Sequence, residues 1–113
     1  MIRTRAGPNL GTIIVYRPWS NIICAIENLE FNLNHGPDLT LRNGTYYRLT
    51  VLPGDSIISH DNVPCIDEDE QTVHVEPGQT VYFQYMFALG LIFEVADNQE
   101  KAATTVSTLE PLN

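Results

Sequence analysis

A seven-residue pattern occurs twice in this chain, 24 positions apart. Val51–Ile57 reads Val-Leu-Pro-Gly-Asp-Ser-Ile, and Val75–Val81 reads Val-Glu-Pro-Gly-Gln-Thr-Val. In both copies proline fixes φ near −65° at the first central position of a turn, and glycine allows the positive φ that a type II turn requires at the second. Alternating apolar residues precede and follow each turn, which is typical of β-strands. The repeat therefore predicts a β-scaffold in which each copy reads as strand, tight reversal, strand.

Other segments are rich in β-branched and aromatic residues and are bounded by turn residues, as strands are. These segments are residues 11–16, 22–33, 39–41, 45–51, 56–59, 71–75, 80–87 and 89–95. Asn43-Gly44 separates two of them and predicts a hairpin turn. The fold is therefore predicted to be all-β, an antiparallel β-sandwich of about seven or eight strands. A chain of 113 residues buries a single core, so 11–113 forms one domain after an extended lead-in over 1–10.

The period of the sequence changes from strand to helix near the C-terminal end. Asp97 is expected to cap the first N–H groups of a helix while Glu100 reaches back, which is a capping-box arrangement. The apolar residues that follow share one helical stripe, formed by Ala102, Ala103, Val106 and Leu109. Pro111 prevents the helix from continuing. We expect a short C-terminal helix that lies across a sheet edge.

The charge of the chain excludes one class of partner and concentrates on one segment. The formal net charge is −8 and Lys101 is the only lysine, so direct binding of nucleic acid is not expected. Five of the 14 carboxylates lie between Asp61 and Glu70, where the run Asp67, Glu68, Asp69, Glu70 is continuous. Two interpretations stay open for this run: a solvated loop that keeps the protein soluble, or a docking patch for a basic partner.

The sequence predicts neither a transmembrane segment nor a signal peptide. The longest apolar run, Met86–Phe93, is far shorter than the ~20 residues that span a bilayer, so no transmembrane segment is predicted. The first eight residues are basic but lack the apolar stretch of a signal peptide. The chain is therefore expected either to stay in the cytoplasm, or to act in the periplasm or at the outer membrane after removal of a leader.

The two cysteines, Cys24 and Cys65, have two possible states. They form one disulfide in an oxidising compartment, or they are unrelated thiols in the cytosol. Neither has a second ligand within the spacing of a zinc motif, so we expect no metal there.

No pattern in the chain predicts catalysis or a cofactor. His35, His60 and His74 are too far apart to form a local metal motif and are expected at the surface, although His60, Asp61 and His74 could converge on an ion. The acidic run resembles a calcium loop in charge only, because the alternating oxygens and central glycine of an EF-hand are missing. A serine nucleophile would need an elbow motif that is absent from the sequence. We therefore expect a protein that is not an enzyme and needs no cofactor.

Three aromatic residues are candidates for partner binding. Tyr46 and Tyr82 lie on the expected outer phase of their strands, and Trp19 follows Pro18 in a loop. Surface tyrosine and tryptophan residues often anchor a protein partner or a sugar ring. The alternative is that these rings pack on neighbouring strands or on the C-terminal helix.

Several of these motifs together resemble a known family. Tyr16-Arg17-Pro18, Asn43-Gly44-Thr45-Tyr46-Tyr47, Pro53-Gly54 and Glu76-Pro77-Gly78-Gln79-Thr80-Val81-Tyr82-Phe83 are similar to the layout of small bacterial envelope lipoproteins of an uncharacterised domain family. The resemblance covers residues 11 to 110 and implies a transthyretin-like or related β-sandwich that an N-terminal lipid tethers to a membrane. This chain departs from the pattern because it has no leader and no lipobox cysteine before residue 11. The resemblance implies no catalytic residues in this chain.

Three functions are consistent with these observations. The first is a non-enzymatic module of the bacterial cell envelope that binds another protein through loops or a sheet edge. The second is a phage-encoded or intracellular inhibitor whose acidic surface occupies a basic site on a partner protein. The third is a sugar-binding module that uses Trp19 and surface tyrosines.

Overall fold

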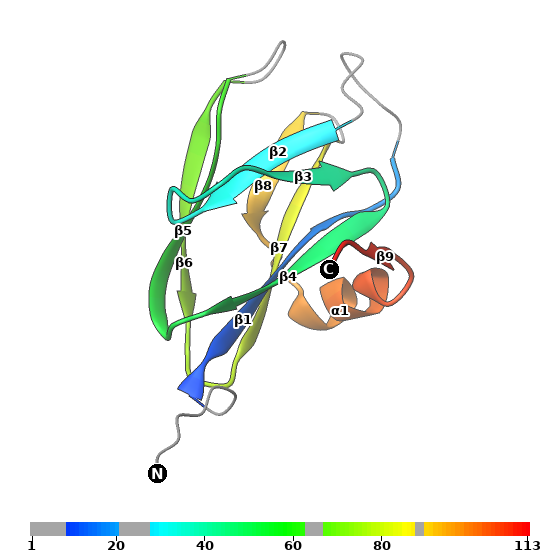
Figure 1. Ribbon diagram of the computed structural model, residues 1–113. Helices are drawn as coiled ribbons and strands as arrows, with labels where there is room; N and C mark the ends of the chain where they lie inside the picture. The colour runs from blue at the N-terminus through cyan, green and yellow to red at the C-terminus, as the bar shows by residue number, and fades with distance from the viewer. Residues whose placement is uncertain (1–8, 21–27, 63–66, 88–89) are drawn as a thin grey trace.

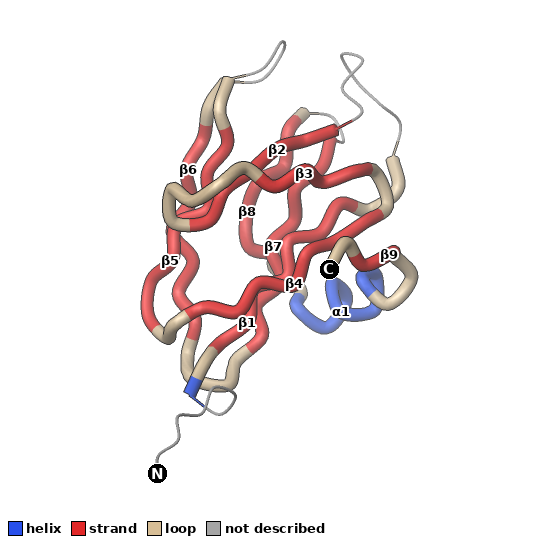
Figure 2. Tube along the Cα trace, in the orientation of Figure 1, coloured by secondary structure: helices blue, strands red, loops and turns tan. Residues whose placement is uncertain are grey.

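The computed structural model describes residues 9–20, 28–62, 67–87 and 90–113, which form a β-sandwich with one short helix (Figures 1 and 2). One sheet has five strands in the order β8-β7-β1-β4-β9, and the other has four in the order β3-β2-β5-β6. The predicted mainly β sandwich is confirmed. The strands are β1 (Gly11–Arg17), β2 (Asn28–Leu33), β3 (Leu39–Arg42), β4 (Thr45–Val51), β5 (Gly54–His60), β6 (Asp69–Val75), β7 (Thr80–Phe87), β8 (Leu91–Val95) and β9 (Glu110–Pro111).

The two Pro-Gly turns pass the chain between the sheets. Pro77-Gly78 is a type II turn, because Gly78 has φ 76° and the Gln79 N–H donates to the Glu76 carbonyl at 3.0 Å. It leads from β6 in the four-stranded sheet to β7 in the five-stranded sheet. Pro53-Gly54, with Gly54 at φ 114°, leads from β4 back to β5. The prediction of strand, turn, strand holds, but the strands that each turn joins are not hairpin partners.

The hairpin predicted at Asn43-Gly44 is also wrong, because the strands on either side of this turn do not pair with each other. Gly44 has the expected positive φ of 76°, yet β3 and β4 on either side belong to different sheets. The Gly44 N–H donates to the carbonyl of Arg17 at the end of β1, at 2.9 Å. A turn residue fixes the local backbone, but tertiary packing decides which strands then pair.

Strand β1 lies near the centre of the five-stranded sheet and is buried on both faces. It pairs antiparallel with β4 over seven residues and parallel with β7 over five. Ile13 and Val15 face the interior of the sandwich, whereas Ile14 and Tyr16 face the other side, under the helix. Burial on both faces explains why this strand reads as a continuous apolar run instead of an alternating one. The interior core also contains Leu29, Phe31, Leu41, Val51, Ile58, Val73, Val75, Val81, Phe83, Tyr85 and Phe93.

The helix α1 (Gln99–Val106) covers the outer face of the five-stranded sheet. The expectation that it lies across a sheet edge is therefore wrong. Its Ala102 and Val106 pack on Ile14 and Tyr16 of β1. The predicted capping box is also wrong, because the cap is Asn98, whose Oδ1 accepts the Lys101 N–H at 3.0 Å. No helix in the described part of the chain is long and apolar enough to cross a membrane.

After the helix the chain returns to the sheet as the short strand β9, beyond the seven or eight strands predicted. β9 pairs parallel with β4, and the Leu112 N–H donates to the Tyr46 carbonyl at 2.8 Å. Pro111 is part of this strand, so it is not the residue that ends the helix.

Two side-chain amides continue the hydrogen bonding of the five-stranded sheet where its outer strands stop. Gln99 accepts the Tyr82 N–H at 2.8 Å and donates to the Tyr82 carbonyl at 3.0 Å, beyond the last paired residue of β8. Asn113 does the same for Arg48 of β4, at 3.0 and 2.9 Å. Each amide has one donor and one acceptor edge, as a peptide group does, and so replaces a strand residue.

Candidate functional site

Negative charge is concentrated on the hairpin formed by β5 and β6. Seven of the 14 carboxylates lie between Asp55 and Glu76, and none of the six basic residues does. β6 is an edge strand, because β5 is its only strand partner among the described residues. An edge strand presents backbone N–H and C=O groups that another chain can pair with. The hairpin therefore combines open backbone groups with one sign of charge.

A hollow of about 510 Å³, here called the acidic hollow, lies at the end of this hairpin that carries residues 60 and 69. Three of the four residues of the predicted acidic run line it, namely Glu68, Asp69 and Glu70, whereas Asp67 is exposed and is not part of its wall. The rest of the wall is formed by Asn32, His35, Ser59, His60 and Asp61. No described arginine or lysine lines it, so its field favours cations or a basic partner.

The strands that carry the acidic hollow are held together by short polar contacts. The Ser59 hydroxyl donates to Asn32 Oδ1 at 2.7 Å, which joins β5 to β2. His35 Nε2 lies 4.0 Å from a Glu70 oxygen, and both side chains are mostly exposed. Among the described residues no group of three or more His, Cys, Asp or Glu side chains could hold a metal ion.

His60 is not at the surface, contrary to the sequence expectation. Its side chain is 3% exposed and stacks on Tyr85, with ring centroids 5.3 Å apart, and it contacts Phe93 edge-on at 4.6 Å. Its Nδ1 lies 3.1 Å from the Asp61 carbonyl oxygen, while Nε2 has no hydrogen-bond partner in the described structure. The interior phase of β5 places this imidazole among aromatic rings of the core.

His74 lies at the opposite end of the hairpin, so it does not converge with His60 and Asp61 on an ion. Its Nδ1 is 2.8 Å from Asp55 and its Nε2 is 2.5 Å from Glu76, next to the two Pro-Gly turns. Hydrogen bonds to Asp55 and then to Glu76 raise the pKa of His74 above its usual 6.5. This exposed cluster favours the imidazolium form and locally offsets the negative charge of the hairpin.

Trp19 is an exposed aromatic residue in the loop after β1, where the sequence placed it. Its side chain is 70% exposed, and it lines a shallow hollow of about 250 Å³ together with Arg42, Asn43, Gly44, Thr45 and Glu110. The Asn43 side chain fixes the neighbouring Ser20 by donating to its carbonyl at 2.9 Å and accepting its N–H at 3.1 Å. These bonds also give Asn43 of the Asn-Gly-Thr sequence a structural role. We call this region the Trp19 corner.

The two tyrosines predicted for partner binding are half-buried beside the helix. Tyr82 meets Tyr16 edge-on with ring centroids 6.5 Å apart, and Tyr46 and Tyr82 both pack on the cluster under α1. The structure therefore brings them together with the helix and not with Trp19 or the acidic hollow.

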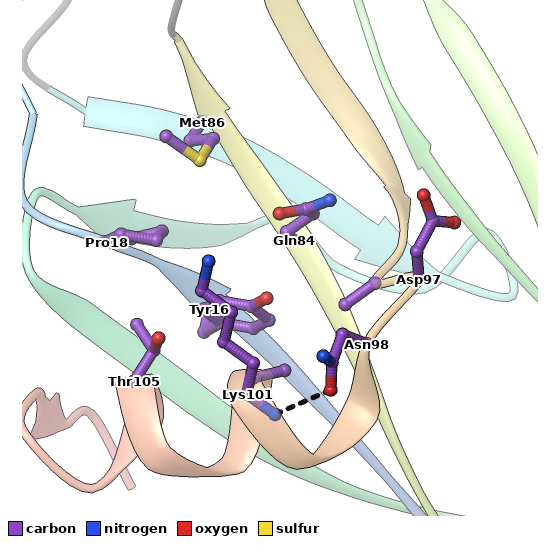
Figure 3. Close-up of a pocket in the computed structure, with 10 residues that line it drawn as sticks. Tyr16, Pro18, Gln84, Met86, Asp97, Asn98, Lys101 and Thr105 are labelled. Carbon is purple, nitrogen blue, oxygen red and sulfur yellow. Dashed lines mark hydrogen bonds between the residues drawn. The ribbon is translucent and has the colours of Figure 1, made fainter.

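A cleft that the sequence did not indicate opens between α1 and the sheet (Figure 3). Its volume is about 400 Å³. Tyr16 and Pro18 from β1 and its end, Gln84 and Met86 from β7, and Lys101 from α1 line it. We call it the helix–sheet cleft. The sequence does not reveal this cleft, because its residues come from three segments that the fold alone brings together.

Arg17 lies at the end of β1 and is a buried charge. Its side chain is 1% exposed, and Nη1 donates to the Leu41 carbonyl at 3.1 Å, which links β1 to β3 across the sandwich. Burial lowers the pKa of the Arg17 guanidinium, an effect that nearby Tyr85 opposes. The alternation of β1 could not reveal this role, because that strand is buried on both faces. Cys24 and Cys65, for which a disulfide and two separate thiols were both considered, lie outside the described residues.

Comparison with known proteins finds no protein-family model, no curated protein and no solved structure that matches this chain.

Proposed function

We propose that this chain is a non-enzymatic protein-binding module of the bacterial cell envelope, and that its partner docks a basic segment on the β5–β6 hairpin. The observation that carries the proposal is the edge strand β6, which has one strand neighbour among the described residues and belongs to a hairpin that, with Glu76 directly after it, carries seven carboxylates and no arginine or lysine. An envelope location follows from the family resemblance. A disulfide between Cys24 and Cys65 would accompany that location.

The hairpin supports two independent contributions to binding. Exposed Thr72 and His74 alternate along β6 with buried Val73 and Val75, so a strand that pairs with β6 would continue an existing face of the sheet. Main-chain hydrogen bonds then provide affinity, as in other cases of strand addition. The carboxylates of the acidic hollow accelerate the encounter with a basic surface and select its charge.

A photo-crosslinking experiment tests the edge strand. A photoreactive amino acid at Thr72 on β6 is expected to form an adduct with the partner in living bacteria, whereas the same residue at Thr50 on β4, which is also exposed but lies in the other sheet, is expected to form none. Mass spectrometry identifies the partner. Adducts at Thr50 but not at Thr72 would place the binding surface elsewhere.

Charge reversal tests the acidic contribution with the partner so identified. The double variant Glu68→Lys, Glu70→Lys is expected to weaken binding at least about tenfold and to reduce its salt dependence. The matched control is Glu94→Lys, Glu100→Lys, which reverses two exposed carboxylates outside the hairpin and is expected to leave affinity nearly unchanged. Equal effects of the two double variants would contradict a specific acidic site.

The same acidic surface supports a second function, inhibition of a partner by occupying its basic site. The envelope binding module and the inhibitor differ in cellular location and in whether the partner pairs with β6. An inhibitor gives adducts with a cytoplasmic basic enzyme, loses activity when Glu68 and Glu70 are reversed, and leaves the exchange rates of β6 amide protons unchanged in the complex. A partner strand paired with β6 instead slows exchange of those amides.

A further inference from the structure

The helix–sheet cleft presents hydrogen-bond donors around an apolar bed. In Figure 3 the Lys101 side chain extends from α1 over the ring of Tyr16, and Gln84 projects from β7 on the far side. Pro18 and Met86 supply apolar surface at one end of the cleft. No carboxylate lies within 4.0 Å of the Lys101 ammonium in the part of the chain that the structure describes. The only lysine of the chain is thus available to a ligand.

The polar groups of the cleft favour an anion. Lys101 is a cation, and burial raises the pKa of the Tyr16 hydroxyl, which keeps it a donor at neutral pH. The amide of Gln84 can turn an N–H toward the same space. Asp97, the one carboxylate that lines the cleft, points its oxygens away from these groups in Figure 3. The lining as a whole is therefore formally neutral, and its positive charge is confined to Lys101, in a chain whose net charge is −8.

The surroundings restrict the anion to a small amphiphile with a single charge. A dianion such as a phosphate monoester would meet twice the repulsion from the acidic chain, whereas one carboxylate matches one ammonium. β1 and β7 are paired on both sides, so the floor offers side chains and few free backbone groups. An extended peptide laid there would lose its own backbone hydrogen bonds without replacement, but a hydrocarbon chain loses none. A volume of about 400 Å³ is at the lower end of the range for small-molecule sites.

We propose that the helix–sheet cleft binds a fatty carboxylate, with the carboxylate on Lys101 and Tyr16 and the hydrocarbon chain on Pro18 and Met86. This site lies on the outer face of the five-stranded sheet, away from the β5–β6 hairpin. It is independent of the docking surface proposed above, and either can fail without the other.

Titration of the full chain with sodium decanoate below its micelle concentration, followed by ¹⁵N–¹H and methionine methyl NMR, tests the proposal. We expect shifts at Gln84, Lys101 and Ala102, and contacts between the hydrocarbon chain and the Met86 methyl group. Decanol, which has the same chain and no charge, is expected to bind at least about tenfold more weakly. Shifts confined to the Trp19 corner or the acidic hollow, or binding that begins only above the micelle concentration, would reject the site.

Variants at Lys101 separate the charge from the cleft itself. Lys101→Met is expected to weaken decanoate binding about tenfold or more and to leave decanol binding unchanged, while Lys101→Arg retains most of the affinity. Arg42→Met removes an exposed cation outside the cleft and serves as the matched control. Lys101 is itself exposed, so these variants are expected to fold. If Lys101→Met and Arg42→Met weaken binding equally, or if a short acidic peptide binds more tightly than decanoate, the fatty-carboxylate assignment is wrong.

Discussion

The indole ring of Trp19 lies directly against the backbone of Gly44, where a Cβ atom would come within 2.2 Å of the indole Cε2. Gly44 is therefore required twice, by its φ of 76° and by the ring that covers it. The contact explains how a side chain that is 70% exposed can still be fixed in position. A preoriented aromatic ring loses little entropy on binding, which is what an anchor at an interface requires.

Gly44→Ala is expected to destabilise the fold more than Gly78→Ala does. Both glycines have φ 76°, so each alanine has the left-handed strain of about 1–2 kcal/mol, but nothing lies within 4 Å of a Cβ at position 78. The clash with Trp19 adds about 1–3 kcal/mol at position 44 alone. Urea unfolding measures the difference, and Trp19, the only tryptophan, reports its own displacement by fluorescence.

A double variant isolates this contact. In a Trp19→Ala background the cost of Gly44→Ala is expected to fall to that of Gly78→Ala, because only the backbone strain remains. An unchanged cost would mean that the ring moves aside without penalty.

His60→Ala is expected to cost about 2–4 kcal/mol, because it removes a ring that packs on Tyr85 and Phe93 in the core. His60→Phe keeps the ring and removes the buried Nε2 that has no partner in the described structure, at the loss of the contact with Asp61. We expect this second variant to be within about 1 kcal/mol of the parent. If urea unfolding gives both variants the same cost, the contact of Nδ1 with the Asp61 carbonyl is the dominant role of His60.

The pH dependence of His74 follows from its raised pKa. The folded state favours the imidazolium, so its stabilising contribution is complete below pH 6.5 and is lost as the pH rises through the higher pKa of the folded state. NMR titration of the imidazole is expected to show this pKa lowered in Asp55→Asn and lowered less in Glu76→Gln. His74→Gln should remove this part of the pH dependence of unfolding. Identical titration curves in the parent and both carboxylate variants would show that the hydrogen bonds to Asp55 and Glu76 do not hold in solution.

Gln99→Leu is expected to destabilise the protein by about 2 kcal/mol or more, because it removes three hydrogen bonds and leaves the Tyr82 N–H without its acceptor. Asn98→Ala, which removes only the cap, is expected to cost about 1 kcal/mol. Hydrogen exchange provides a local readout, since the Tyr82 amide should lose protection in Gln99→Leu but not in Asn98→Ala. Equal protection in the two variants would contradict the strand-like role of Gln99.

The sequence predicted those features of the fold that depend on neighbouring residues. The alternation in β2 and β4, the positive φ of Gly44, Gly54 and Gly78, and the presence of a C-terminal helix all follow from local chemistry. The pairing of strands does not follow from local chemistry. A turn at Asn43-Gly44 or Pro53-Gly54 is compatible with a hairpin or with a change of sheet, and only the packing of the two cores decides between them.

The candidate sites also differ in how far the sequence could predict them. The acidic run was evident because its members are contiguous, and Trp19 because a tryptophan after Arg-Pro stands outside the strand pattern. The helix–sheet cleft combines residues from β1, β7 and α1, and no spacing in the sequence connects Tyr16, Gln84 and Lys101. The interior position of His60 depended on the exact end of β5, which the prediction placed one residue too early.

The position of β1 has a mechanical consequence. The chain enters β1 beside the Pro77-Gly78 turn, where the Gly78 N–H donates to the Leu10 carbonyl, whereas the other end of the β5–β6 hairpin lies toward the far end of the molecule (Figure 1). A force applied at Leu10 would therefore enter the sheet through β1. Force along β1 loads its bonds to both β4 and β7 in shear, so that they must break together and not one after another. Resistance to pulling is set by the rate of unfolding, so this arrangement is expected to slow unfolding under force.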